Sequence, residues 1–224
     1  MSLIILKYAL ATLPSLFITG GVIYLNKQAK EVVQLLLISF AAGCFVTIPC
    51  YLFQTWFVAK GFDGESSTLE LILFSFLGIA ALEELVKFFA LWLISRKIGF
   101  TNPDTPVITS LLVAMGFTFV ENLIYAYKYD WITVAVRMFT ALPLHIICGT
   151  IVGIFLGKTI NKSGNEKNYL LAIGLLVAIL IHGFYDLFIE QKWNESLSAL
   201  SLFVLFIGIG VIFFLKKKPS SINV

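Results

Sequence analysis

Seven ionisable side chains lie well inside stretches of sequence that are otherwise apolar. A charge at the centre of a bilayer costs about 2.5–3.5 kcal/mol on insertion scales, so such residues normally face the interior of a helix bundle and mark a functional site. An eighth, Arg137, lies close enough to the end of its apolar stretch to reach the membrane surface. We take the acids and histidines as candidate catalytic residues and the lysine as their neighbour: Glu83, Glu84, Lys87, Glu121, His145, His182 and Asp186.

Residues four positions apart share one face of a helix, and two pairs of these side chains have that spacing. Glu83 and Lys87 can therefore pair, whereas Glu84 is rotated by about 100° and points toward a different neighbour. His182 and Asp186 likewise share a face. The spacing predicts one buried pair on each of two helices and leaves Glu84 without a partner on its own helix.

Carboxylates and imidazoles together can activate water. A glutamate takes a proton from the water molecule, and an imidazole or a cation stabilises the oxyanion that develops. No serine nucleophile is evident among these residues, and nothing indicates a lowered pKa for Cys148, three residues after His145. The residue types therefore indicate hydrolysis by activated water rather than attack by a side chain.

A bound metal ion is an alternative way to activate the same water. Two histidines and a carboxylate form a common catalytic zinc set that leaves one position for water, and Glu121, His145 and His182 offer those ligands. Four candidate carboxylates against two cations, Lys87 and Arg137, leave a formal charge of −2, which Zn²⁺ or another divalent ion would cancel. Protonation of one or two carboxylates would do the same, and the sequence has no HExxH motif. Metal-dependent and metal-free mechanisms both stay open.

The elements that carry these residues have the composition of a membrane protein. Of 224 residues, 59% are hydrophobic and only 13% are charged, and the mean hydropathy is +0.94. Soluble domains are about one quarter charged. The composition therefore excludes a water-soluble globule, a disordered chain and a nucleic-acid-binding protein.

Seven apolar segments are long enough to cross a bilayer as helices, which takes roughly 20 residues each. Helices are expected because every backbone polar group must be satisfied inside lipid. We predict an all-α polytopic membrane protein with a single domain over residues 1–224, ending in a basic cytoplasmic tail over residues 216–224. The segments are Leu3–Leu25, Val32–Ala59, Leu69–Ile94, Val107–Tyr127, Ile132–Leu156, Tyr169–Ile189 and Leu197–Leu215.

The distribution of basic residues predicts how the chain is oriented in the cell membrane. The loops on one side, with the C-terminal tail, carry ten lysines and arginines, and the loops on the other side carry four. Because basic loops stay in the cytoplasm, we expect the C-terminus there and the N-terminus outside. With a helix rise of about 1.5 Å per residue, the candidate residues lie roughly 6–20 Å below the outer surface, where they can line one cavity open to the outside.

The apolar segment around His145 has two features that affect packing. Pro143 removes one backbone hydrogen bond and bends the helix nearby. Gly149, Gly153 and Gly157 repeat at a spacing of four, which permits close contact with another helix.

The order of these motifs resembles that of the PrsW family of intramembrane proteases, which is related to the CAAX prenyl endopeptidases. The resemblance extends from Pro14 to Asp186 and implies hydrolysis of a peptide bond near the outer face of the membrane. The implied substrate is a single-pass membrane protein such as an anti-sigma factor. The motifs, on successive helices, are Glu83-Glu84-x-x-Lys87, Phe117-x-x-x-Glu121-Asn122-x-x-Tyr125, the lone His145 and His182-x-x-x-Asp186.

The same resemblance implies a role for each candidate. Glu83 would be the general base and Glu84 a supporting carboxylate. Glu121 and His145 would hold water or a metal ion, and the later His–Asp pair would stabilise the oxyanion or complete a metal shell. Relatives are described both as metalloproteases and as metal-free glutamic proteases, so the resemblance leaves the cofactor open.

Two other interpretations use the same residues. A proton- or ion-coupled transporter or channel also relies on buried carboxylates and histidines, although no two matching halves with interrupted helices are visible. A catalytically silent scaffold would bind partner helices through the glycine-rich face. In each case the partners are the lipid bilayer and membrane proteins, and no nucleic acid is expected.

Overall fold

The computed structural model describes residues 2–27 and 30–216, and in this part of the chain every regular element is a helix. This confirms the predicted all-α polytopic fold. Apart from Lys216, the predicted basic tail lies outside the described residues. In chain order the elements are α1 (Ser2–Leu25), α2 (Lys30–Ala59), α3 (Thr68–Leu73), the π-helix η1 (Phe74–Ala81), α4 (Leu82–Ile98), α5 (Asp104–Lys128), α6 (Trp131–Phe139), α7 (Ala141–Lys158), α8 (Gly164–Glu190), the 3-10 helix η2 (Glu195–Ala199) and α9 (Leu200–Lys216).

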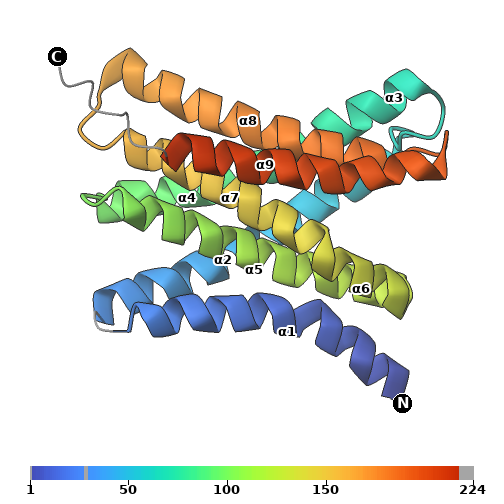
Figure 1. Ribbon diagram of the computed structural model, residues 1–224, viewed down its shortest axis with the longest axis horizontal. Coiled ribbons are helices and arrows are strands. Elements are labelled where there is room, and N and C mark those ends of the chain that lie inside the picture. The colour runs from blue at the N-terminus through green and yellow to red at the C-terminus, as the bar shows by residue number, and fades with distance from the viewer. Residues whose placement is uncertain (1, 28–29, 217–224) are drawn as a thin grey trace.

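Seven membrane-crossing segments can be followed through the bundle. Six are long and apolar enough to span a bilayer, when α6 and α7 are taken together as the segment Trp131–Lys158. The seventh, predicted over Leu69–Ile94, is built from α3, η1 and α4 in succession, because the π-helix interrupts it. The start of α1 and the end of α9 lie at opposite ends of the bundle (Figure 1), as an odd number of crossings requires.

The predicted bend near Pro143 is present as a break between α6 and α7. Thr140 leaves the helical conformation with φ −124° and ψ −66°. A proline ring clashes with the carbonyl four residues before it, here that of Phe139, so α6 ends at that residue. Pro143 itself lies in the first turn of α7, where its missing N–H would have had no helical partner.

Helix α7 lies at the centre of the bundle and is buried along nearly its whole length. Its glycines allow α5 to approach closely, as predicted. A Cβ atom at Gly153 would lie 2.6 Å from Cα of Val107, and one at Gly157 would lie 2.5 Å from the carbonyl oxygen of Pro103. Helices α8 and α9 cover another side of α7, and Leu91, Ile151, Ile181 and Val204 meet in the core between them.

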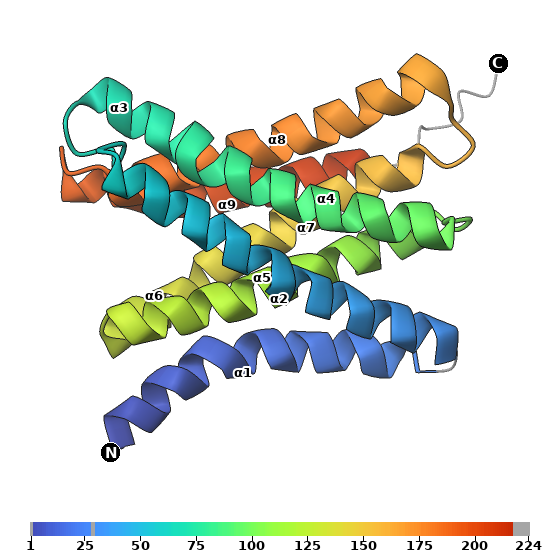
Figure 2. The same cartoon turned by 180° about the vertical axis from the view of Figure 1, so that it is seen from behind.

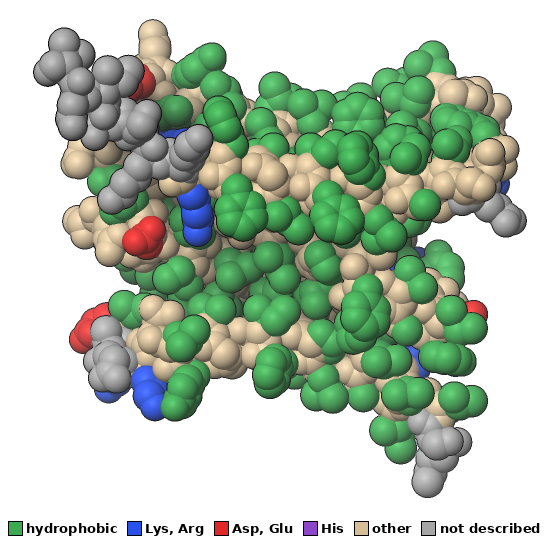
Figure 3. Space-filling model, in the orientation of Figure 1, with side chains coloured by type: hydrophobic (Ala, Val, Ile, Leu, Met, Phe, Trp, Pro, Cys, Tyr) green, Lys and Arg blue, Asp and Glu red, His purple; other side chains and the backbone are tan. Residues whose placement is uncertain are grey.

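The outer surface suits a lipid environment. Hydrophobic side chains cover most of the face in Figure 3, and the charged side chains gather near its two ends. Large apolar residues such as Phe17, Phe45 and Phe214 are exposed on the outer helices. From behind, α2 crosses in front of α5 (Figure 2). The two helices touch at Gly43, where an added Cβ would lie 2.0 Å from the carbonyl oxygen of Val113.

Candidate functional site

Glu83 and Glu84 occupy the first turn of α4, directly after the π-helix η1. Each i→i+5 turn rotates the residues that follow it relative to an uninterrupted α-helix, and such turns are frequent at functional sites. The local winding of η1 therefore decides where the two carboxylates point. Both side chains are directed into the bundle, with only 3% and 2% of their surface exposed.

Glu84 is the acceptor at the centre of a buried charged cluster. Nζ of Lys87 donates to its Oε1 at 2.6 Å, and Nδ1 of His182 donates to the same oxygen at 2.7 Å. The sequence favoured a pair between Glu83 and Lys87, but the structure pairs the lysine with the glutamate three residues before it. Positions i+3 and i+4 are both within reach on a helix. The rotation that η1 gives α4 brings Glu84 to the lysine, and the same oxygen of Glu84 meets His182.

Helix α8 supplies His182 and Asp186 from the face that meets η1. Gly183 allows this approach, since a Cβ atom there would lie 2.4 Å from Cδ1 of Phe76. Nε2 of His182 lies 3.4 Å from Oδ2 of Asp186 and 3.7 Å from Oε2 of Glu83. The predicted shared face of His182 and Asp186 is therefore present, and Glu83 from α4 faces the same imidazole nitrogen.

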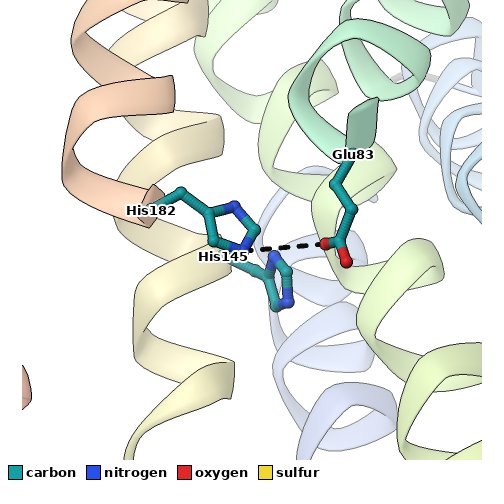
Figure 4. A group of neighbouring side chains, drawn as sticks. All are labelled: Glu83, His145 and His182. Carbon is teal, nitrogen blue, oxygen red and sulfur yellow. Dashed lines mark ion pairs between the residues drawn. The ribbon is translucent and has the colours of Figure 1, made fainter. Parts of the chain in front are cut away.

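His145 of α7 links the two halves of the cluster. Nζ of Lys87 is 3.0 Å from its Nδ1, and its Nε2 is 2.9 Å from Oε2 of Glu121. An ammonium has no acceptor, so Nδ1 accepts and the proton lies on Nε2, which donates to the carboxylate. The ring stands edge-on to that of His182 with a centroid distance of 5.2 Å. Figure 4 shows the two imidazoles side by side, with the carboxylate of Glu83 directed toward them.

Arg137 of α6 belongs to the cluster rather than to the membrane surface. Its Nη2 lies 2.7 Å from Oε1 of Glu121, and its Nε donates to Oδ1 of Asn122 at 3.0 Å. The guanidinium also lies 3.5 Å from the ring centroid of Tyr125. The sequence alone is compatible with Arg137 at the membrane surface, and it names Asn122 and Tyr125 only as members of a motif. The break at Thr140 turns α6 so that the arginine reaches α5.

One further residue at the site was not anticipated from the sequence. Gln54 of α2 donates from Nε2 to Oε1 of Glu83 at 3.0 Å. The available signal was a polar amide near the end of the apolar segment Val32–Ala59. An uncharged amide costs less free energy in a membrane helix than a charged group does, so nothing in the sequence singled out Gln54.

Two carboxylate oxygens at the site have no hydrogen-bond partner among the described residues. They are Oε2 of Glu83 and Oδ2 of Asp186, and both are buried. Both face Nε2 of His182, at the ion-pair distances given above. Unpaired buried acceptors are rare and costly, so these three atoms mark the place where a water molecule, a metal ion or a substrate group would supply the missing contacts. The neighbouring side chains of Glu121, Arg137 and Asp186 retain 13–15% exposure, which puts the least covered side of the cluster there.

The donor set suits a divalent metal ion such as Zn²⁺. Glu83, His145 and His182 each offer a ligand atom, and these atoms lie within 4.8 Å of one another. The set expected from the sequence, Glu121 with His145 and His182, shares both histidines with this group. In the structure Arg137 and His145 contact the two oxygens of Glu121, and Lys87 and Glu121 contact the two ring nitrogens of His145. His182 is well oriented for a metal, because its Nδ1 donates to Glu84 and its Nε2 is directed at the unpartnered oxygens.

Comparison with known proteins gives a consistent result. The family described as PrsW family intramembrane metalloprotease matches residues 31–215. Protease PrsW of Shouchella clausii is 24% identical over 92% of this chain and 94% of its own length. Protease PrsW of Bacillus subtilis is 26% identical over 89% of each chain, and that of Clostridioides difficile 27% identical over 88% of this chain and 86% of its own. No solved structure matches the chain.

Proposed function

Because this chain belongs to the PrsW family of intramembrane metalloproteases, we propose that Glu83 is the base that activates water for hydrolysis of a peptide bond. One observation carries the proposal. Oε2 of Glu83 is buried, lacks a hydrogen-bond partner among the described residues, and lies 3.7 Å from Nε2 of His182. A carboxylate oxygen in this setting can accept a proton from a water molecule that bridges the two side chains.

In this proposal the remaining side chains divide the work of hydrolysis. Glu83 takes one proton from water, and the resulting hydroxide forms a bond to the scissile carbonyl carbon. Protonated His182, oriented by Glu84 and Asp186, donates from Nε2 to the oxyanion. Glu83 then passes its proton to the leaving amine nitrogen as the C–N bond breaks, which returns the carboxylate to its starting state.

A metal ion would be held at the same place, with Glu83, His145 and His182 as the nearest donors. When bound, such an ion supplies Lewis-acid polarisation of the scissile carbonyl. Glu83 would then be a ligand, and Asp186, whose Oδ2 is also unpartnered, would be the carboxylate left to accept a proton. In the metal-free version Lys87 and Glu121 hold His145 in place through its two ring nitrogens. To bind a metal ion, His145 would give up one of these two contacts, because a ligating nitrogen needs a free lone pair.

We propose a single-pass membrane protein as the substrate, in keeping with a site enclosed by membrane-spanning helices. An anti-sigma factor, cut near the outer membrane face, is the specific candidate that the resemblance suggests. The site would then lie in the outer half of the plasma membrane, with the N-terminus of the enzyme outside and its C-terminus in the cytoplasm.

Reconstitution in liposomes tests the function directly. The purified protein is mixed with a fluorogenic single-pass transmembrane peptide that carries a donor–quencher pair across its juxtamembrane segment. We expect cleavage by the wild type and a loss of about 10²–10⁴-fold in Glu83→Gln, the range typical of general acid–base catalysis. Glu190→Gln is the matched control, because Glu190 is an exposed carboxylate one turn beyond Asp186. Unchanged cleavage by Glu83→Gln would exclude Glu83 from either role.

The same assay separates the two versions of the mechanism. Activity is measured before and after a chelator, and the metal content of the protein is determined by elemental analysis. Activity lost with the metal and restored by adding Zn²⁺ supports the metal-dependent version. Activity that persists in metal-free protein supports the version in which Glu83 acts alone as the base.

A further inference from the structure

Gln54 is an uncharged side chain that contacts the proposed catalytic residue Glu83. Its Nε2 donates to Oε1 of Glu83 at 3.0 Å. Among the side-chain hydrogen bonds of the described residues, it is the one that joins α2 to α4. The other long-range bond from α2 runs from Thr47 to the backbone of α5 at Phe117.

The hydrogen bond makes the two oxygens of Glu83 different from each other. Oε1 is bound, and Oε2 is left without a partner and faces His182. The terminal torsion of a glutamate is broad and nearly two-fold, so a carboxylate without such a contact rotates easily. Gln54 therefore decides which oxygen points at the imidazole and holds it there.

The neutrality of the amide also has a consequence. A lysine or arginine at position 54 would hold the same oxygen but would pair with the carboxylate and weaken it as a base. The two cations at the site are engaged elsewhere, Lys87 with Glu84 and Arg137 with Glu121. Glu83 is thus oriented by a donor that carries no charge.

We propose that Gln54 is a positioning residue of the hydrolytic site, which holds Oε1 of Glu83 so that Oε2 meets the reacting water. This inference rests on the proposed role of Glu83. The amide exchanges no proton and forms no bond with the substrate. Its contribution is orientation, which is needed in the transition state more than for substrate binding.

Steady-state kinetics with the fluorogenic transmembrane peptide test the inference. Gln54→Met keeps the length of the side chain and removes its donor. We expect kcat to fall about 10- to 100-fold with KM unchanged, because misorientation affects the reacting groups and not the binding of substrate. Thr47→Val is the control, since it removes a buried hydroxyl from the same helix and should leave kcat as in the wild type.

A second substitution guards against a simple folding defect. Gln54→Leu also removes the donor but adds no charge, and its kcat should fall as in Gln54→Met, while the unfolding temperature of each variant shows whether it is folded. Wild-type kcat in either folded variant, or a change confined to KM, would overturn the positioning role. If the wild type cleaves and Glu83→Gln does not, the proposed function stands whatever the result at position 54.

Discussion

At the scale of single residues, Glu84 and His145 organise the site. Glu84 accepts from both Lys87 and His182 through one oxygen, and His145 joins Lys87 to Glu121. Buried charges of this kind are stable only when each has its partners. The cluster therefore behaves as one unit, in which removal of a member leaves its neighbours unpaired.

Lys87→Met tests this dependence. The substitution removes the ammonium that bonds to Glu84 and His145 and leaves a buried carboxylate short of a partner. We expect the free energy of unfolding in detergent micelles to fall by about 3–5 kcal/mol. The double variant Glu84→Gln/Lys87→Met should recover a large part of that loss, because it removes the unpaired charge as well. Wild-type stability of Lys87→Met would contradict the account.

At the scale of elements, short segments orient the side chains that the long helices carry. The π-helix η1 sets the direction of Glu83 and Glu84, and the break at Thr140 aims α6 at α5. Helix α6 has only nine residues, so its ends matter. Its N-cap is Asp130, whose carboxylate accepts from the backbone N–H of Thr133 at 2.8 Å.

The cap makes the stability of α6 sensitive to acid. The hydrogen bonds from Thr133 lower the pKa of the exposed Asp130 carboxyl. Its contribution to stability is therefore complete above the unfolded pKa of about 3.9, and it is lost as the pH falls through the lower pKa of the folded state. We expect hydrogen-exchange protection of the α6 amides to decrease between pH 6 and pH 2. Asp130→Asn keeps a capping side chain and should show less of this decrease, whereas equal pH dependence would rule out the cap as its source.

The crossing of α2 and α5 is a second place where one element positions another. Gly43→Ala puts a methyl group 2.0 Å from the carbonyl oxygen of Val113, so the helices must separate. We expect a loss of about 1–3 kcal/mol in stability and lower peptidase activity, because α2 carries Gln54 and α5 carries Glu121. Gly20→Ala in α1 is the control, since its added Cβ meets nothing within 4 Å. Unfolding in detergent measures the difference, and equal stability of the two variants would show that the crossing adapts at no cost.

At the scale of the whole molecule, the parts that the sequence predicted are those governed by the membrane. Long apolar runs must be helices in lipid, and charges inside them must turn inward, so the bundle and the convergence of six candidate residues followed from composition. The choice of Glu84 rather than Glu83 as partner of Lys87 did not follow, because it depends on how η1 rotates α4. The contact of Gln54 with Glu83 depends on how α2 crosses the bundle. The residue pattern of one apolar segment does not predict the angle at which that helix crosses its neighbours.

The orientation of the bundle decides from which side a substrate is cut. Asp186, one of the least covered groups of the site, lies one turn before the end of α8, and Lys192 just beyond that end pairs with Glu65 of the loop between α2 and α3. The site is thus closer to this end of the bundle than to the end where α7 connects to α8 (Figure 2). From the excess of basic residues at the α7–α8 end, we predict that this end is cytoplasmic and that the site faces the outside.

Labelling of single cysteines on intact cells checks this orientation. In a background with Cys44, Cys50 and Cys148 replaced by alanine, we expect Ser66→Cys to react with a membrane-impermeant maleimide from outside. Asn165→Cys, an exposed position at the α7–α8 end, should react only after the cells are permeabilised. The reverse pattern would place the least covered side of the site toward the cytoplasm, so that cleavage outside the cell would need another route of access. Peptidase activity of both cysteine variants in liposomes shows that the labelled proteins are folded.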